Sequence, residues 1–261
     1  MAQVSGHVVR VPGHFGEWMQ GRLGSDGPVV LITMACARLG LTAWHGAAAA
    51  PDQRLARLSA ALGHPVAPVH LRLRAAPGLG TGISTASLIA AARLSGWRGR
   101  PADLAHACLA AEGASDPLMF PQPDRLLWAS RRGVICARLP ALPAHEVIGG
   151  FSGPPRPTDP ADQDFPDIAD LVTRWQGCRD LPVFAALASE SAARTLARRG
   201  GQGGDPMADL ARDLGALGWQ IAHTGAARGL IFAPGTVPPH ARAALQAAGL
   251  RGILRFRGGG R

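Results

Sequence analysis

Residues 77–94 read PGLGTGISTASLIAAARL, a glycine-rich turn that runs directly into a helix of small residues. Glycines let the backbone turn sharply and approach a ligand closely, and the free N–H groups at a helix start attract anions. The hydroxyls of Ser84 and Thr85 stand where a magnesium ion bound to phosphate would be. The stretch therefore predicts a phosphate-binding loop.

The common phosphate loops are excluded because this chain of 261 residues contains no lysine. A Walker loop requires one, and so do protein kinases and pyridoxal enzymes. A dinucleotide fingerprint starting at Gly78 would need glycine at position 83, where Ile83 stands. What remains is a loop that holds the anion with main-chain amides and hydroxyls.

The formal charge of +9 is carried entirely by arginine. The arginines form loose groups instead of one stripe, and aromatic residues rarely accompany them. The chain also lacks Asn and Tyr, a pattern expected of coding DNA that avoids A and T, which explains part of the basicity. Nucleic-acid binding remains an alternative, although we expect no nucleic-acid partner. A nucleoside triphosphate would account for some of the charge equally well.

The cysteines are widely spaced, at Cys36, Cys108, Cys136 and Cys178, and form no pair with metal or redox spacing. We expect them to be buried thiols in a reducing cytosol. The histidines offer no helical ligand pair beside a carboxylate. No apolar run approaches the roughly 18 residues of a membrane span, and the N-terminus lacks a signal pattern. The sequence thus predicts a soluble, cytoplasmic protein without a membrane partner.

Hydrophobic periodicity predicts strands alternating with helices, in two lobes divided between Pro140 and Gly150. The expected strands are 8–11, 29–32, 70–74, 125–128, 133–136, 229–232 and 253–256. The expected helices are 52–62, 88–94, 101–112, 168–175, 182–199, 207–216 and 239–248. Residues 152–166 contain five prolines and must form a long loop, either functional or disordered.

Three further segments carry candidate chemistry. Residues 12–21, PGHFGEWMQG, predict a strand that ends in a glycine-bracketed turn holding an acid and an amide. Residues 112–120, EGASDPLMF, place two carboxylates at the exit of a helix. Residues 222–229, AHTGAARG, form another turn of small residues that leads into a strand.

Together these segments resemble the GHMP small-molecule kinases, most closely the L-threonine kinase branch of cobalamin synthesis. The branch pattern Pro-x-x-x-Gly-Glu-x-x-Gln-Gly is matched by Pro12, Gly16, Glu17, Gln20 and Gly21. Its Ser-Ser-Thr-Ala run before Ile-Ala-Ala is similar to residues 84–91. Its Thr-Asp-x-x-Met-Phe segment is similar to residues 115–120, and its late Ala-His-Ser-Gly turn to residues 222–225. The four matches occur in family order over most of the chain.

The chain also departs from the family pattern. Gly80 stands where the family loop has a lysine, and the spacing from Pro77 to the hydroxyls differs slightly. The carboxylate segment is one residue longer. The family's Gly-Gly-x-x-Asp-Thr loop, followed by Phe-Asn-Arg, is not readable in residues 152–159, which leaves the acceptor alcohol open.

The resemblance implies an α+β, two-lobed GHMP kinase fold with mixed sheets and helices packed on them. Residues 1–140 would form the nucleotide-binding lobe, and residues 141–261 a C-terminal lobe completing the substrate cleft. The cofactors implied are ATP and Mg²⁺. The acceptor would be a small amino acid or amino alcohol, with L-threonine favoured and its product entering the aminopropanol arm of cobalamin. The oligomeric state is open, with a homodimer as one option.

The same resemblance, with the needs of phosphoryl transfer, assigns the site residues. The loop binding the triphosphate comprises Pro77, Gly78, Gly80, Thr81, Gly82, Ser84 and Thr85. The ligands of Mg²⁺ are Ser84 or Thr85 together with Glu112. The catalytic residues are Asp116, which orients or deprotonates the acceptor hydroxyl, and Ser84. The acceptor-binding residues are Glu17, Gln20, His223, Thr224 and Gly225. Any side-chain cation at the transferring phosphate must be arginine, with Arg228 and Arg10 as candidates.

Each assignment has a structural alternative. Ser84 could cap a tight turn, Asp116 could stabilise the turn before Pro117, and His223 could be a hydrogen-bonded core histidine. Glu17 and Gln20 are equally compatible with a solvated turn. At the level of the whole chain, the alternatives are a catalytically impaired GHMP-fold binding or scaffold protein and a GHMP kinase for another small alcohol.

Overall fold

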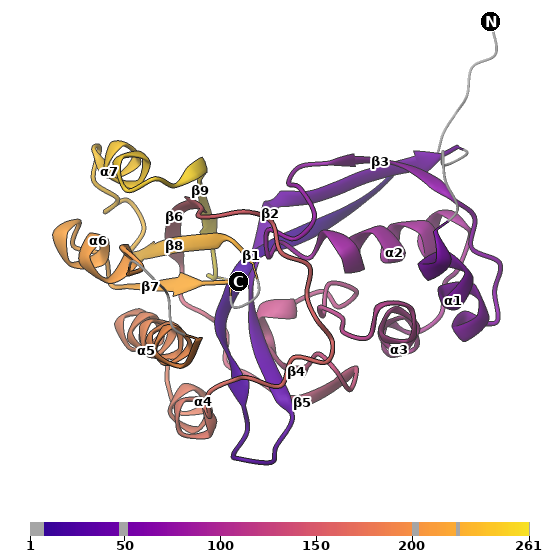
Figure 1. Cartoon of the computed structure of the whole chain (residues 1–261), viewed down its shortest axis with the longest axis horizontal. Helices are drawn as coiled ribbons and strands as arrows, with labels where there is room; N and C mark the ends of the chain where they lie inside the picture. The colour runs from indigo at the N-terminus through magenta and orange to yellow at the C-terminus, as the bar shows by residue number, and fades with distance from the viewer. Residues whose placement is uncertain (1–7, 47–51, 200–203, 223–224, 261) are drawn as a thin grey trace, which may run out of the picture.

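The computed structural model describes residues 8–46, 52–199, 204–222 and 225–260. Two sheets lie side by side along the long axis of the molecule, and helices cover them (Figure 1). The strands are β1 (Val8–Arg22), β2 (Val29–His45), β3 (Val69–Leu73), β4 (Leu126–Ala129), β5 (Val134–Arg138), β6 (His145–Phe151), β7 (Gly218–Ile221), β8 (Ala227–Phe232) and β9 (Arg251–Gly258). The helices are α1 (Gln53–Leu62), α2 (Ile83–Leu94), α3 (Pro101–Glu112), α4 (Ala169–Gln176), α5 (Leu181–Arg199), α6 (Met207–Asp213) and α7 (Ala241–Ala247).

The first sheet has the order β1-β2-β4-β5 with β3 paired to β2, and the second has the order β7-β8-β6-β9. The α+β class is as the sequence predicts. The expectation of mixed sheets is wrong, because every pairing between these strands is antiparallel. Short connections join β1 to β2, β4 to β5 and β7 to β8, and a hairpin connection permits only antiparallel pairing.

Residues 12–21, predicted to be a turn after a short strand, belong to the long strand β1. The glycines and proline do not end the strand but shift its pairing with β2. The shifts lie between Pro12 and Gly13, between His14 and Glu17, and between Glu17 and Met19. Gly16 has a φ of 67°. These shifts are bulges, which let a strand continue while side chains change direction.

Strands β6 and β7 are not predicted from the sequence. β6 occupies the stretch expected to divide the lobes and is the strand between β8 and β9. Its Gly149 lies so close to β8 that an added Cβ would come within 2.1 Å of the Arg228 carbonyl oxygen. Glycine is thus required here for close strand packing, whereas in sequence a glycine pair indicates a break.

One hydrophobic core joins the two sheets. Phe15 on β1 is fully buried, and its ring lies 5.7 Å, between centroids, from both Phe151 on β6 and Phe256 on β9. Trp18, also on β1, packs at 5.7 Å against Trp175 of α4. Edge-on aromatic contacts of this kind add to the free energy of burial. β1 therefore fixes the position of the second sheet relative to the first.

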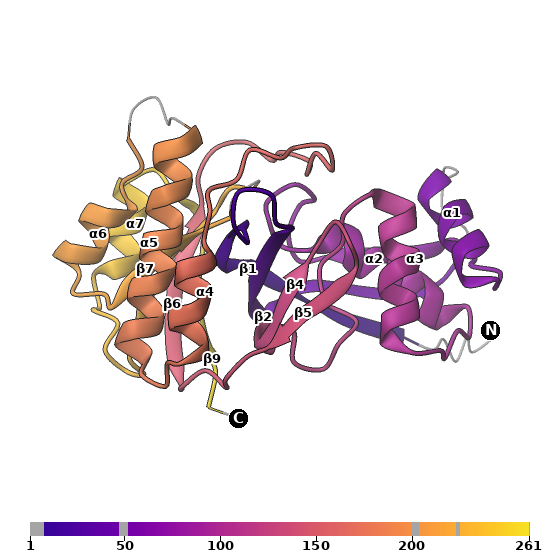
Figure 2. The same cartoon turned by 90° about the horizontal axis from the view of Figure 1, so that it is seen from below.

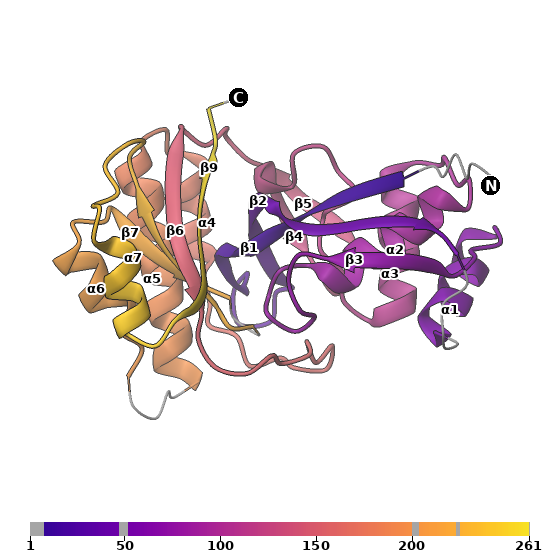
Figure 3. The same cartoon turned by 90° about the horizontal axis from the view of Figure 1, so that it is seen from above.

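Residues 152–166, which we call the strap, form the irregular connection from β6 towards α4, as their prolines predict. Figures 2 and 3 show that it runs from the second sheet out over the first and returns. Arg131, between β4 and β5, donates hydrogen bonds from Nε to the Pro160 carbonyl (3.2 Å) and from Nη2 to the Asp159 carbonyl (3.3 Å). The strap is therefore attached to both halves of the molecule.

Two smaller expectations concern burial and membranes. Cys36, Cys108 and Cys178 are buried free thiols as predicted, but Cys136 is exposed because it lies on the outward side of β5. None of the helices in the described part of the chain is both long and apolar enough to span a membrane.

The core position of Phe15 predicts a large effect on stability. Phe15→Ala should lower the free energy of unfolding by about 3–5 kcal/mol, because it removes a buried ring and leaves a cavity between the sheets. Val8→Ala, on the exposed start of the same strand, is the control and should change it by less than about 0.5 kcal/mol. Guanidinium unfolding followed by tryptophan fluorescence measures both. A loss below about 1 kcal/mol for Phe15→Ala would contradict a core shared by the two sheets.

Candidate functional site

The glycine-rich loop precedes α2 and is shaped by three glycines in the left-handed region. Gly78, Gly80 and Gly82 have φ values of 81°, 75° and 69°. Gly82 is the N-cap of α2, and no side chain caps the helix there. The Ser84 hydroxyl donates to the Glu112 carboxylate, so Ser84 does not cap the helix as the alternative interpretation expected. The helix start is left for an anionic ligand.

Neighbouring strands hold this loop in place. On the β1 side, the amides of His14 and Gly16 donate to the carbonyls of Thr81 (3.2 Å) and Gly80 (3.0 Å). On the β8 side, a Cβ on Gly225 would lie 2.4 Å from the Gly80 nitrogen. Gly225, predicted to bind the acceptor, therefore packs behind the loop and does not line the cavity. The predicted residues His223 and Thr224 lie outside the described residues.

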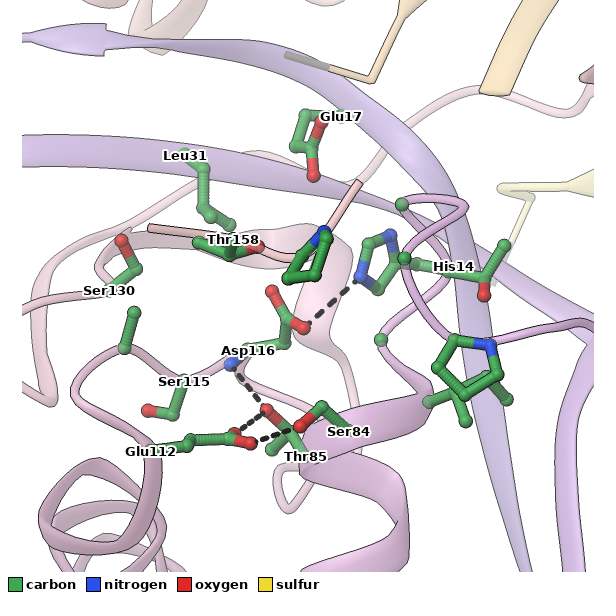
Figure 4. A pocket seen from close by; sticks show the side chains of 18 of the residues that line it. His14, Glu17, Leu31, Ser84, Thr85, Glu112, Ser115, Asp116, Ser130 and Thr158 are labelled. Carbon is green, nitrogen blue, oxygen red and sulfur yellow. Dashed lines mark hydrogen bonds and ion pairs between the residues drawn. The ribbon is translucent and has the colours of Figure 1, made fainter. Parts of the chain in front are cut away.

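A half-buried carboxylate, Glu112, links the start of α2 to the end of α3. Both Ser84 and Thr85 donate hydroxyl hydrogen bonds to Glu112, one to each carboxylate oxygen (Figure 4). Arg54 on α1 donates from Nη1 to the Ser84 hydroxyl at 2.9 Å. The structure thus brings together the three predicted metal ligands from two helices.

The charge state of Glu112 follows from its surroundings. Burial raises its pKa to about 7, although the hydrogen bonds from Ser84 and Thr85 act in the opposite direction. The nearby Asp116 carboxylate adds to the rise. A carboxylate that is costly to ionise in the protein alone is one that a nearby cation would stabilise.

These donors fit Mg²⁺ when a phosphate shares the ion. Mg²⁺ prefers hard oxygen ligands and usually binds through one or two carboxylates plus substrate phosphates. Within the ranges that the structure describes, no cluster of three or more His, Cys, Asp or Glu residues could hold a metal by itself. The Glu112 carboxylate and the two hydroxyls at the start of α2 suit a Mg²⁺ ion whose other ligands are phosphate oxygens. They are too few to bind the ion with protein ligands alone.

Asp116 lies beside this cluster and is paired with a histidine that the sequence analysis assigned no role. The Asp116 amide donates to Thr85 Oγ1 at 3.2 Å, and its Oδ2 lies 3.3 Å from Nε2 of His14 (Figure 4). Burial lowers the pKa of His14, but Asp116, together with Glu17 and the Gly16 carbonyl, outweighs this effect and the net pKa is raised. The only sequence signal for His14 was its place in the glycine-bracketed segment.

A cavity of about 460 Å³ opens between the glycine-rich loop, β1, the end of α3 and the strap. The side chains and backbone that line it are His14, Glu17, Gln20, Leu31, Pro77, Gly78, residues 80–85, Glu112, residues 114–116, Ser130, Arg131 and residues 155–158. All predicted loop, metal and catalytic residues are included, as are Glu17 and Gln20. The sequence analysis gave no role to His14, Arg131 or the strap residues.

The two predicted arginines lie elsewhere. Neither Arg228 nor Arg10 lines the cavity. Arg228 donates from Nε to Asp205 at 2.7 Å, and both side chains are largely buried. Its guanidinium is therefore committed to that ion pair and cannot serve the transferring phosphate.

Comparison with known proteins finds no matching family model and no matching curated protein. Solved structures do match over nearly the whole chain. A mevalonate kinase from Methanococcus jannaschii has a TM-score of 0.60 at 9% identity, covering 98% of both chains. A mevalonate kinase from methicillin-resistant Staphylococcus aureus has a TM-score of 0.58 at 14% identity, covering 96% of this chain and 98% of its own.

A putative homoserine kinase from Listeria monocytogenes is similar in the same way, with a TM-score of 0.58 at 15% identity, covering 97% of this chain and 99% of its own. At such low identities the likeness establishes the fold. The predicted α+β fold of the GHMP kinases is thereby confirmed.

The raised pKa of Glu112 predicts a pH-dependent stability. The folded protein binds this proton more tightly than the unfolded chain, so stability falls as pH rises from about 4.5 to about 7. Glu112→Gln removes the effect. Without ligands, the variant should gain about 2–3 kcal/mol relative to the parent at pH 8, and nothing below pH 4.5.

Urea unfolding at a series of pH values measures this difference. Asp26→Asn, in the exposed turn between β1 and β2, is the matched control and should show no comparable trend. A Glu112→Gln protein that is less stable than the parent at pH 8 would contradict the assignment.

Proposed function

We propose that this chain is an ATP-dependent kinase that phosphorylates the hydroxyl of a small metabolite, with L-threonine as acceptor and O-phospho-L-threonine for cobalamin synthesis as product. The observation that supports this most is the convergence of the Ser84, Thr85 and Glu112 oxygens with Asp116 below an uncapped helix start. Phosphoryl transfer requires mainly positioning and charge complementary to the transition state. In this proposal the cavity residues supply the positioning, and the helix start with a bound cation supplies the charge.

In this proposal the polyphosphate of ATP lies against the glycine-rich loop and the start of α2. The main-chain amides there and the helix dipole stabilise its negative charge. Ser84, Thr85 and Glu112 would hold Mg²⁺. When bound, the ion would neutralise phosphate oxygens in the transition state. Residues 1–140 would then bind the nucleotide, and residues 141–261 would complete the cleft through the strap.

Asp116 accepts the proton of the acceptor hydroxyl. As the hydroxyl oxygen bonds to the terminal phosphorus, the bond from that phosphorus to the bridging oxygen breaks and ADP leaves. His14 acts as a positioning residue, because it contacts one carboxylate oxygen of Asp116 at 3.3 Å and leaves the other for the substrate. The Asp116 side chain is 23% exposed, enough for contact with a ligand in the cavity.

L-Threonine is favoured by the sequence resemblance and is compatible with the cavity lining. Glu17 and Gln20 on β1 offer a carboxylate for the ammonium group and an amide for the carboxylate of an amino acid. Leu31 adds an apolar contact for a methyl group. The alternative acceptors are other amino acids and amino alcohols of similar size.

A screen of acceptors tests the function. The protein is incubated with Mg-ATP and a panel of hydroxylated amino acids and amino alcohols, and products are identified by phosphorus NMR and mass spectrometry. We expect O-phosphothreonine and stoichiometric ADP from L-threonine. L-Valine, which replaces the hydroxyl by a methyl group, should give neither. Phosphorylation of a different alcohol would overturn the acceptor assignment, and a nucleotide-dependent thermal shift without ATP consumption would favour a binding protein.

Asp116→Asn should separate chemistry from nucleotide binding. The amide cannot accept the proton, so kcat should fall by about 10²- to 10⁴-fold. The Kd for ATP should stay within about threefold, because Asp116 faces the acceptor. Calorimetry and a coupled ADP assay measure the two quantities. Asp103→Asn, an exposed carboxylate on α3, is the control. Nearly full activity of Asp116→Asn would show that Asp116 is not the base.

A further inference from the structure

Among the described residues that line the cavity, a permanently charged side-chain cation is present at only two positions. Its carboxylates come from Glu17, Glu112 and Asp116, and its guanidinium groups from Arg131 and Arg156. A triphosphate brings further negative charge, and the chain contains no lysine. An arginine must therefore contribute to charge neutralisation at the phosphates.

The guanidinium of Arg131 is occupied by structural contacts. Besides its hydrogen bonds to the strap carbonyls, its Nη1 donates to the Ser130 hydroxyl at 3.3 Å. Its guanidinium also stacks on the Phe165 ring, 4.9 Å from the centroid. Arg54, which reaches Ser84 from α1, forms a two-pronged ion pair with Asp52, with a shortest distance of 2.7 Å. Neither side chain is available to follow a phosphate during transfer.

Arg156 differs from both. It lines the cavity and is exposed, and no described residue forms a hydrogen bond or ion pair with its guanidinium. Its amide donates to the Gly78 carbonyl at 2.8 Å, which seats this part of the strap on the glycine-rich loop. A Cβ on Gly78 would lie 3.0 Å from the Arg156 nitrogen, so the glycine makes this contact possible.

The strap holds Arg156 in position despite lacking secondary structure. Pro155 and Pro157 flank it and restrict the backbone on both sides. Further along, the guanidinium groups of Arg131 and Arg199 both pack on the buried ring of Phe165, 4.9 Å and 4.7 Å from its centroid. These contacts restrain the backbone of the strap and so reduce the entropy that the loop would lose when a ligand binds.

We propose that Arg156 is the side-chain cation that binds the transferring phosphoryl group, in the role that lysine cannot fill in this chain. The inference rests on the proposed kinase function. A guanidinium can donate two parallel hydrogen bonds to phosphate oxygens, which suits a group whose charge is spread over its equatorial oxygens. Arg156 is placed for this because it lines the cavity and its backbone is seated on Gly78 of the glycine-rich loop, against which the polyphosphate would lie.

The test uses Arg156→Ala and Arg156→Lys in the full chain. The control is Arg242→Ala on the exposed side of α7, which also removes one positive charge. We expect Arg156→Ala to lower kcat by about 10²- to 10³-fold. It should weaken binding of ATP about fivefold or more and binding of ADP by less than about twofold. Arg156→Lys should recover about tenfold in kcat, and Arg242→Ala should match the parent.

Three outcomes would overturn the inference. An Arg156→Ala protein with kcat within about twofold of the parent would show that Arg156 does not act in transfer. A raised KM for the acceptor with unchanged kcat would place Arg156 at the acceptor instead. In both cases an active parent leaves the kinase function intact. If the parent protein neither binds nor consumes ATP in calorimetry and the ADP assay, the proposed function fails and the inference fails with it.

Discussion

The hydrogen bonds from two adjacent hydroxyls to the carboxylate of Glu112 are the constraint on which the site depends. They join the first turn of α2 to the last residue of α3, and thereby fix where the glycine-rich loop ends. The position of Asp116 depends on the same hydroxyls, because its amide donates to the hydroxyl of Thr85. The hydroxyls and the nearby Arg54 do not fully compensate the desolvation of this carboxylate, because its pKa is raised to about 7. The geometry that positions the catalytic candidates is thus one that a divalent cation would stabilise.

β1 relates this site to the core. Within one bulged stretch it places Phe15 between the sheets, directs His14 towards Asp116, and supplies Glu17 to the cavity. A regular strand alternates its side chains between two faces. The left-handed Gly16 interrupts that alternation, and an added Cβ there would lie 2.6 Å from Oε1 of Gln220 on β7. Packing of the second sheet and geometry of the site are consequently set by the same few residues.

Local patterns in the sequence predict much of this arrangement. The end of α3 and the proline-rich strap follow from helical periodicity and proline, whereas α2 begins at Ile83, before the predicted start at residue 88. Ser84, Glu112 and Asp116 are grouped as site residues by the resemblance to the GHMP kinases. What local patterns could not reveal depends on distant partners. β6 is a strand because β8 and β9 pair with it, although its glycines resemble a break. His14 becomes a site residue only because the fold brings residue 116 to it.

The absence of lysine then has a physical consequence for how charge is arranged in the cavity. A lysine would place a point charge that persists to high pH, whereas here the cation beside Asp116 is an imidazole. Burial disfavours the charged imidazole, but Asp116, Glu17 and the Gly16 carbonyl together more than offset that, so the pKa of His14 is raised. As pH rises through this raised value, His14 loses its charge and Asp116 loses its ion-pair partner. The Asp116 carboxylate is therefore held most firmly below that pKa, whereas the arginines that line the cavity stay charged as the pH rises further.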